Sequence, residues 1–451
     1  MNTTLQPAVA GLARRIEGPV LLPGQNGYDD ERSGFNLACE HRPDVVVGAA
    51  STADVVAAVR FAADQGIQVV AQATGHGVGV PLEGGLLIST RRLDGVQLDP
   101  GARTARIEAG VRWRQVIDPA AASGLAPLSG SSPLVGAVSY TLGGGLPVLG
   151  RTFGWAADQV RRLEVVTADG ELVIADPDQN ADLFWALRGG KGGFGVVTAM
   201  EVDLVVPPGL YGGGLVFAAE RAADVVHTWR DWTARLPDAM NSSAGLVRMP
   251  DAPGIPEPLR GRLTVHIRIA YAGPFDEGEE LVRPLRDIGP RIVDTVAGLP
   301  LADIAAVYDD PTEPIAYDER SLMLSSFDEG AADALIAAAG PDASADGLIM
   351  VGVRQLGGAL ARPPRHPHAL DHDDAAFSVA AIGLGPAAGD AVLSALAPWG
   401  TGLRFLNFVG GPAASVLAPE AFRTGTRDRL AAIKQVRDPG GVFPAPHLGV
   451  S

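Results

Sequence analysis

The sequence VVAQATGHGVGV, residues 69–80, joins a run of small and β-branched residues to a glycine-rich loop. Upstream, residues 44–50 (DVVVGAA) form another apolar run of the length of a buried strand. Between the two runs, Ser51–Asp54 has capping-box spacing, residues 55–65 are rich in alanine, and Gly66 is placed to end a helix. We therefore predict a strand, a helix and a strand in succession, the beginning of a layered α/β structure.

Further short elements are predicted up to residue 206. The predicted strands are 85–89, 96–99, 104–109, 163–167, 172–175 and 196–206, and the predicted helices are 113–123 and 183–188. Ala168-Asp169-Gly170 separates two of these strands and predicts a hairpin turn. Two more glycine-rich loops lie in this half of the chain, around Gly143–Gly145 and at residues 189–195.

Pro207-Pro208-Gly209 is the clearest boundary signal in the chain. After it, short strands alternate with alanine-rich helices to about residue 395, which predicts an α+β domain with its own sheet. A strand at 404–408 and a helix at 421–436 are predicted in the remaining residues.

The composition excludes several classes of partner. The 451 residues include 36 Lys and Arg against 52 Asp and Glu, a formal net charge of −16, so no nucleic-acid partner is expected. Cys39 is the only cysteine, which excludes an internal disulfide, and we interpret it as a core residue rather than a reactive thiol. No apolar run approaches the ~18 residues that a membrane span needs, so a cytoplasmic location without membrane contact is expected.

The three glycine-rich loops together indicate a ligand site. Glycine lets the backbone approach a ligand closely and point its N–H groups at phosphate oxygens. None of the loops fits a dinucleotide fingerprint: the stretch around Gly143–Gly145 lacks the G-x-G-x-x-G spacing, and no G-x-x-x-x-G-K-[ST] sequence occurs. Each loop alone is compatible with an ordinary turn, but the three together predict a cradle for a large ligand with a pyrophosphate.

The order of several segments resembles the FAD-linked oxidases of the vanillyl-alcohol oxidase superfamily, which have a PCMH-type FAD-binding domain, and especially the berberine-bridge-enzyme-like branch. The matching segments are residues 42–62, 69–100, 126–145, 163–173, 182–198 and 433–443, with a looser match at 354–362. The resemblance implies an α+β, two-domain fold. Its parts are an FAD-binding domain at 1–206, a separate antiparallel-sheet substrate-binding domain at 207–395 and a C-terminal return to the FAD-binding domain at 396–451.

The resemblance also implies the FAD site. His76 takes the place of the histidine that commonly bonds to the flavin 8α-methyl group, which implies a covalent link; a histidine that only hydrogen-bonds the cofactor is the alternative. Ser132 stands where the bicovalent branch has a cysteine, so no second tether is expected. Val135 aligns with the position that gates oxygen access, where valine goes with oxidases. The implied FAD-binding residues are Ala73, Thr74, Gly75, His76, Gly77, Val80, Gly130, Ser131, Ser132, Val135, Gly136, Ser139, Tyr140, Gly143, Gly144, Gly145, Gly193, Gly195, Val196, Val197, Asn407 and Phe408.

The catalytic base is less well defined. Many relatives use tyrosines where this chain has Phe405 and Phe408, and residues 357–365, where other relatives carry a carboxylate, have none. His372 titrates near neutral pH and aligns with a histidine common in relatives, so it is the first candidate, with a structural role as the alternative. Tyr140, which replaces a histidine of some relatives, is the second.

Three functions are compatible with these residues. The first is an FAD-dependent oxidase of secondary metabolism, which takes hydride from a C–H bond of an alcohol, sugar or polycyclic natural product and passes the electrons to dioxygen. The second is a flavin-bound cyclase or isomerase with no net redox change, which the loss of both tyrosines favours. The third is a flavin-binding protein without catalysis. A small-molecule substrate and dioxygen are the expected partners, and no metal is expected.

Overall fold

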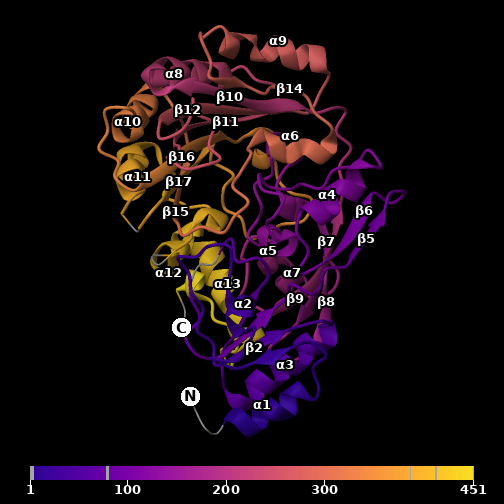
Figure 1. Ribbon diagram of the computed structural model, residues 1–451. Helices are drawn as coiled ribbons and strands as arrows, with labels where there is room; N and C mark the ends of the chain where they lie inside the picture. Colours follow the sequence, from indigo (N-terminus) through magenta and orange to yellow (C-terminus); the bar gives the residue numbers. More distant parts are fainter. Residues whose placement is uncertain (1–4, 78–80, 386, 412–413, 450–451) are drawn as a thin grey trace.

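The computed structural model describes residues 5–77, 81–385, 387–411 and 414–449. These residues form three sheets with helices packed around them (Figure 1). The structure therefore has the α+β character that the sequence predicts. Cys39 is buried, with 5% of its surface exposed, and burial raises the pKa of its thiol.

The first sheet contains the predicted strand–helix–strand unit. In spatial order its strands are β1 (Val20–Leu21), β2 (Val45–Gly48), β4 (Leu86–Ser89) and β3 (Val69–Gln72). Helix α3 (Thr52–Gln65) connects β2 to β3, and both strands run parallel to β4, which lies between them. The Ser51 hydroxyl accepts a hydrogen bond from the Asp54 amide, and Gly66 ends the helix with φ 63°. The local signals in the sequence thus define this helix correctly.

The second sheet is antiparallel and completes the N-terminal half. In spatial order its five strands are β5 (Val96–Asp99), β6 (Thr104–Glu108), β9 (Val196–Asp203), β7 (Val160–Val166) and β8 (Leu172–Ala175). Strands β7 and β8 form the predicted hairpin, in which Val166 pairs with Leu172.

The third sheet is a separate antiparallel sheet in the middle of the chain. Its strands, in spatial order, are β13 (Val293–Asp294), β10 (Tyr211–Ala218), β12 (Leu263–Tyr271), β11 (Met240–Arg248), β16 (Leu348–Gln355), β17 (Phe377–Gly383) and β15 (Asp318–Leu324), with β14 (Ala297–Gly298) also paired to β10. Apolar residues of one face form a buried cluster with helices, which Figure 1 shows beside the sheet. These helices are α8 (Ala222–Thr233), α9 (Phe275–Arg286), α10 (Glu329–Ala339) and α11 (Asp390–Leu396).

The opposite face of this sheet is not covered by those helices. Along β12, Val265, Ile267 and Ile269 belong to the helix-covered core, so the alternating residues His266 and Arg268 point to the other side. That second face is turned toward the N-terminal half of the chain, where it forms one wall of a cavity.

Residues after 396 return to the N-terminal half. The predicted helix is present as α13 (Thr424–Arg437), and its Arg437 forms an ion pair with Asp182 on α7 (Ala181–Leu187) in the N-terminal half. Apolar residues of this segment, among them Leu430, Ile433 and Leu448, join the core cluster of the N-terminal half. The Val69 amide donates a hydrogen bond of 2.7 Å to the Val442 carbonyl, so the segment is also bonded to β3.

The predicted strand at 404–408 is wrong. Residues Leu406–Phe408 form a single turn of 3-10 helix. The segment does run along the edge of β15, but Phe405 bonds to the side chain of Ser321 in place of a backbone partner. A ladder of backbone bonds therefore does not continue through these residues.

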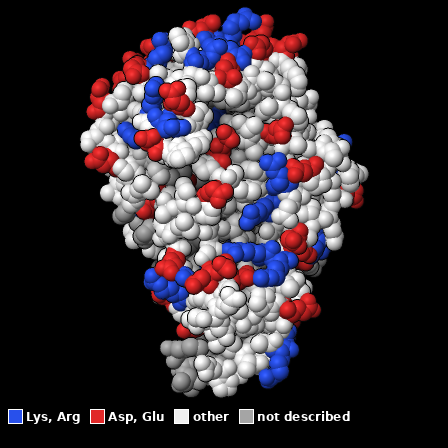
Figure 2. Space-filling model, in the orientation of Figure 1, with Lys and Arg blue, Asp and Glu red and all other residues white. Residues whose placement is uncertain are grey.

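The remaining helices are short and lie mainly in the N-terminal half. They are α1 (Leu5–Ala13), α2 (Tyr28–Arg32), α4 (Arg114–Ala121), α5 (Ala137–Leu142), α6 (Gly150–Phe153), α7 (Ala181–Leu187) and α12 (Ala414–Leu417). No helix in the described residues is long and apolar enough to cross a membrane. Figure 2 shows basic side chains interspersed with acidic ones over the visible face, without a continuous basic surface.

Candidate functional site

A cavity of about 860 Å³ lies between the uncovered face of the third sheet and the N-terminal half. One wall comes from β3 and the loop after it, from residues 130–142 and from the glycine-rich loop at 191–197. The opposite wall comes from β11, β12, β16 and β17, and residues 443–447 close one side. Small-molecule sites span roughly 300–1,000 Å³, so this cavity has room for a large ligand and a smaller one.

The structure brings together most of the residues that the sequence assigns to the FAD site. Those that line the cavity are Ala73, Gly75, His76, Gly77, Gly130, Ser131, Ser132, Val135, Ser139, Tyr140, Gly193, Gly195, Val196, Val197, Asn407 and Phe408. Those that lie beside it without lining it are Thr74, Gly136, Gly143, Gly144 and Gly145. Val80 lies outside the described residues.

His76 is held rigidly at the cavity wall. Its ring stacks on Phe35 with the two centroids 3.9 Å apart, and its Nδ1 lies 2.8 Å from the Thr74 hydroxyl. Its Nε2 is buried and has no hydrogen-bond partner in the described residues. Burial, with a smaller contribution from the positive charge of Arg112, lowers the pKa of His76 to about 4, so the ring is neutral at pH 7. A neutral imidazole has one nitrogen with a free lone pair, which is what a nucleophile or hydrogen-bond acceptor needs.

A titratable pair lies near His76. Burial lowers the pKa of Lys191 to about 8, opposed by the negative charge of Glu319. Burial raises the pKa of Glu319 to about 8, opposed in turn by Lys191. Tyr317 donates a hydrogen bond of 2.7 Å to the His76 carbonyl, and it interacts with Glu319 as well. Lys191, Tyr317 and Glu319 therefore lie at the same side of the cavity as His76.

Tyr140 is a buried phenol at the cavity wall. Its hydroxyl has no hydrogen-bond partner in the described residues, and burial raises its pKa strongly. Its ring packs edge-on against Trp113, with centroids 5.6 Å apart. A phenol with a raised pKa stays protonated, so Tyr140 is suited to donate a hydrogen bond rather than to accept a proton.

Gly143–Gly145 are packed against protein side chains. A Cβ at Gly143 would lie 2.0 Å from Asn407 Oδ1, and one at Gly144 would lie 2.6 Å from Leu370 Cδ2. A Cβ at Gly145 would lie 2.5 Å from the Tyr140 ring. These glycines therefore let α5 approach neighbouring segments closely, and Asn407 Nδ2 uses that approach to donate to the Tyr140 carbonyl at 2.8 Å.

His372 lies away from the described cavity lining. Its ring packs between Trp155 and Phe405, with centroid separations of 5.9 and 5.7 Å, and it is 5% exposed. Burial is the main cause that lowers the pKa of His372 to about 4. The surroundings are those of a core histidine.

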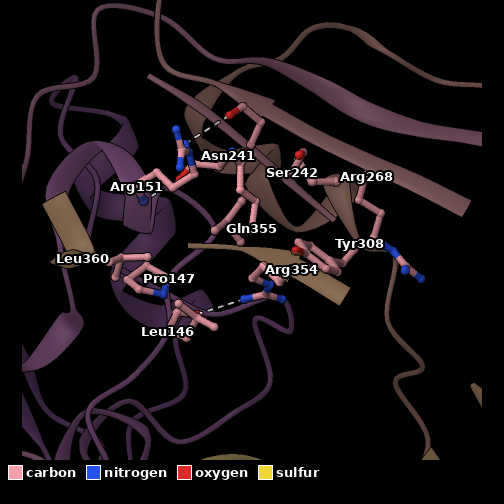
Figure 3. A pocket seen from close by; sticks show the side chains of 13 residues that line it. Leu146, Pro147, Arg151, Asn241, Ser242, Arg268, Tyr308, Arg354, Gln355 and Leu360 are labelled. Atoms are coloured by element: carbon pink, nitrogen blue, oxygen red, sulfur yellow. Dashed lines mark hydrogen bonds between the residues drawn. The ribbon is translucent and has the colours of Figure 1, made fainter. Parts of the chain in front are cut away.

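Four polar residues that the sequence did not single out face the cavity from the third sheet and from the segment before β15. Figure 3 shows the ring of Tyr308 between the side chains of Arg268 and Arg354. The guanidinium carbons lie 5.2 and 4.6 Å from the ring centroid. The Ser243 hydroxyl lies 3.3 Å from the Tyr308 hydroxyl, and Arg354 donates to the Leu146 carbonyl at 3.2 Å. All of these residues also line the cavity.

The sequence contained one signal for this wall. In residues 263–271, LTVHIRIAY, polar Thr264, His266 and Arg268 alternate with apolar residues, which indicates a strand with one polar face. The sequence around Tyr308 shows no such alternation, because this residue follows a short 3-10 segment, Leu301–Val307.

The described residues contain no group of three or more His, Cys, Asp or Glu placed to hold a metal ion.

Comparison with known proteins locates an FAD binding domain in residues 43–176. The chain is 29% identical over 284 residues to (R)-6-hydroxynicotine oxidase of Paenarthrobacter nicotinovorans, over 62% of this chain and 61% of that protein. The matched stretches span less than two thirds of the length of the curated relatives.

Two solved structures share the fold over nearly the whole chain. BBE-like 1 of Physcomitrella patens has a TM-score of 0.82 at 19% identity, with 98% of each chain covered. Glucooligosaccharide oxidase of Acremonium strictum, whose cofactor is a 6-S-cysteinyl, 8α-N1-histidyl FAD, has a TM-score of 0.79 at 22% identity, with 97% of each chain covered.

Proposed function

We propose that this chain, whose residues 43–176 match an FAD binding domain, is a member of the vanillyl-alcohol oxidase superfamily and an FAD-dependent oxidase of a small organic molecule. The observation that carries the proposal is the position of the cavity, which has the matched domain on one side and the third sheet on the other. The similarity to oxidases favours net oxidation over a cyclase, an isomerase or a protein without catalysis.

The residues of the N-terminal wall fit FAD. Buried polar atoms are nearly always hydrogen-bonded, yet His76 Nε2 and the Tyr140 hydroxyl have no partner among the described residues. Gly193 and Gly195 have φ of 101° and 152° and line the cavity, so backbone there can lie close to a ligand. Bound FAD would supply a two-electron acceptor that takes hydride from a substrate C–H bond and is reoxidised by dioxygen.

His76 is the residue that we propose as the covalent tether. Thr74 fixes the orientation of the ring through Nδ1, and its hydroxyl also accepts a hydrogen bond from the Gly136 amide at 3.3 Å. The low pKa of His76 keeps the ring uncharged at pH 7, so it has a lone pair available for bond formation. Val135 also lines the cavity, and we propose that it controls the access of dioxygen there.

Tyr308 is the residue that we propose as proton acceptor. Its hydroxyl is held by Ser243 at the cavity wall, and the guanidinium groups of Arg268 and Arg354 flank its ring. A general base must be held within reach of the proton that it accepts, and these contacts fix the position of Tyr308. In this proposal Tyr308 Oη takes the hydroxyl proton of an alcohol substrate, Tyr140 donates a hydrogen bond, and His372 has no catalytic role.

The test of this function uses the absorption spectrum of the purified protein. We expect a yellow protein with FAD bound, whose colour bleaches when a substrate alcohol is added without oxygen. Admission of air should restore the colour and produce hydrogen peroxide. A protein that stays colourless after incubation with FAD would exclude the proposal, and substrate conversion without peroxide would favour the isomerase.

A further inference from the structure

Four polar side chains form a row across the substrate-side wall of the cavity. Arg268 on β12 pairs in register with Ser243 on β11, Ser243 with Arg354 on β16, and Arg354 with Ser378 on β17. Residues directly paired across antiparallel strands lie on the same face of the sheet. All four also line the cavity. The row therefore places two positive charges and two hydroxyl groups along one line of this wall.

Neither guanidinium in the row is neutralised. Within the described part of the chain, no carboxylate oxygen lies within 4.0 Å of Arg268 or Arg354. Arg106, on the second sheet, shows the contrast, because it forms ion pairs with Glu108 and Glu164. Guanidinium groups in such a place are suited to bind an anion, with carboxylate as their best geometric match.

The hydroxyl of Ser378 is a second, independent sign of a ligand. The residue is 2% exposed and its Oγ has no hydrogen-bond partner among the described residues. A buried hydroxyl without a partner is rare and costs stability unless something bound supplies the partner. Because Arg354 and Ser378 are paired in register, one anionic group can contact both.

The wall beside the row is apolar. The next positions along β16 and β17 are Gly352, Met350, Ala380 and Ile382, and all four line the cavity. A Cβ at Gly352 would make only ordinary contacts, the nearest at 3.6 Å, so this position leaves open space. Three acidic residues line the cavity. Asp310 and Glu319 interact with each other near Tyr317 on the His76 side, and Glu83 forms an ion pair with Arg42.

We propose that this wall binds the carboxylate of an amphipathic organic acid. The carboxylate contacts Arg354 and Ser378, Arg268 adds positive charge from the other side of the Tyr308 ring, and the apolar body lies against Met350 and Ile382. This inference deepens the proposed function and rests on it, because it names the substrate class as an organic acid with an oxidisable C–H bond. It assigns to the arginines the role of substrate recognition.

The test is a titration of the FAD-loaded protein with benzoate, followed by calorimetry and by the flavin spectrum. Benzamide has nearly the same shape without the charge, so we expect it to bind at least about tenfold more weakly, because a hydrogen bond to a charged group is stronger than one to a neutral group. Arg354→Gln should weaken benzoate binding about tenfold, Arg268→Gln should weaken it by a smaller factor, and both should leave benzamide binding unchanged. Arg248→Gln is the matched control, because Arg248 is on β11 but bonds to the Ala339 carbonyl on the helix-covered side.

Further measurements distinguish the loss of an anion contact from the misfolding of a variant. Arg354→Lys should restore part of the benzoate affinity, and high salt should weaken benzoate binding to the unmodified protein. Equal binding of benzoate and benzamide would overturn the proposal, as would displacement of benzoate by an equal concentration of inorganic phosphate. The same preparations are tested for FAD content and for reoxidation by dioxygen after photoreduction. Failure there contradicts the oxidase function, whereas the calorimetric difference between benzoate and benzamide separately decides the anion site.

Discussion

The surroundings of His76 explain why a single histidine could hold a cofactor. Stacking on Phe35 and the contact with Thr74 fix the ring, while Nε2 is left without a partner. We expect flavin to remain with the polypeptide after acid precipitation and His76→Ala to release it. Thr74→Val, which keeps the imidazole but removes its hydroxyl partner, should slow covalent incorporation without abolishing it. Free extraction of FAD from the unmodified protein by acid would contradict the covalent link and leave the binding site intact.

The choice of catalytic base lies between Tyr308 and His372. If Tyr308 accepts the substrate proton, Tyr308→Phe should lower kcat by ~10²–10⁴, the usual contribution of a positioned base. The flavin content should not change, because Tyr308 belongs to the substrate-side wall. Steady-state turnover and single-turnover reduction would measure the effect. The opposite result, a loss of this size in His372→Ala with normal turnover in Tyr308→Phe, would assign the base to His372.

The glycines at the end of α5 show how elements are brought together around the site. Gly143→Ala would place a methyl group 2.0 Å from Asn407 Oδ1. We expect a loss of about 1–3 kcal/mol in the free energy of unfolding from overpacking. Gly192→Ala is a matched control, since nothing lies within 4 Å of its added Cβ. Urea unfolding of both variants, and of Gly143→Ala combined with Asn407→Gly, would show whether Asn407 causes the loss; no rescue in the double variant would contradict this cause.

Elements with local signals could be predicted from the sequence, and elements that depend on distant partners could not. Ser51 and Gly66 define α3 at both ends, and both act within a few residues of the helix. The segment at 404–408 looks like a strand by its composition, but its structure depends on the hydroxyl of Ser321. That contact joins residues 84 positions apart, and no local pattern reveals it.

The two walls of the cavity also differ in how far local sequence signals define them. The N-terminal wall of the cavity, where we propose that FAD binds, could be predicted because its glycine-rich loops lie close together in sequence and match a known family. The substrate wall depends on strand register, which pairs Ser243 with Arg354 more than a hundred positions later. For Gly143 the sequence predicts close approach of the backbone to a ligand, whereas the structure shows that Asn407 fills the space where a Cβ would lie. For His372 the sequence shows the residue type but not the direction of its side chain.

The two domains are joined by a buried arginine as well as by the shared cavity. Arg151, on α6, donates from Nε to the Met240 carbonyl at 2.8 Å and from its guanidinium to the Leu356 carbonyl. The residue is 6% exposed, and burial lowers its pKa. Arg151 therefore satisfies carbonyl groups on two different strand regions of the second domain.

Arg151→Met should weaken the whole molecule. Each buried carbonyl that loses its donor costs about 1–3 kcal/mol, so we expect the free energy of unfolding to fall by about 2–4 kcal/mol. Arg114→Met removes an arginine whose ion pair with Asp118 is exposed, and it should change stability by less than about 1 kcal/mol. Denaturant unfolding at equal flavin content provides the comparison, and equal losses in the two variants would show that Arg151 does not join the domains.

The segment that closes one side of the cavity is also among the last parts of the chain to be synthesised. Residues 443–447 line the cavity, and Val442 bonds to β3, which is synthesised several hundred residues earlier. During translation, all three sheets can therefore leave the ribosome before the wall of the cofactor site is complete. It follows that FAD would be captured and attached after these residues emerge, so that ribosome-bound chains stalled before residue 442 should carry no flavin.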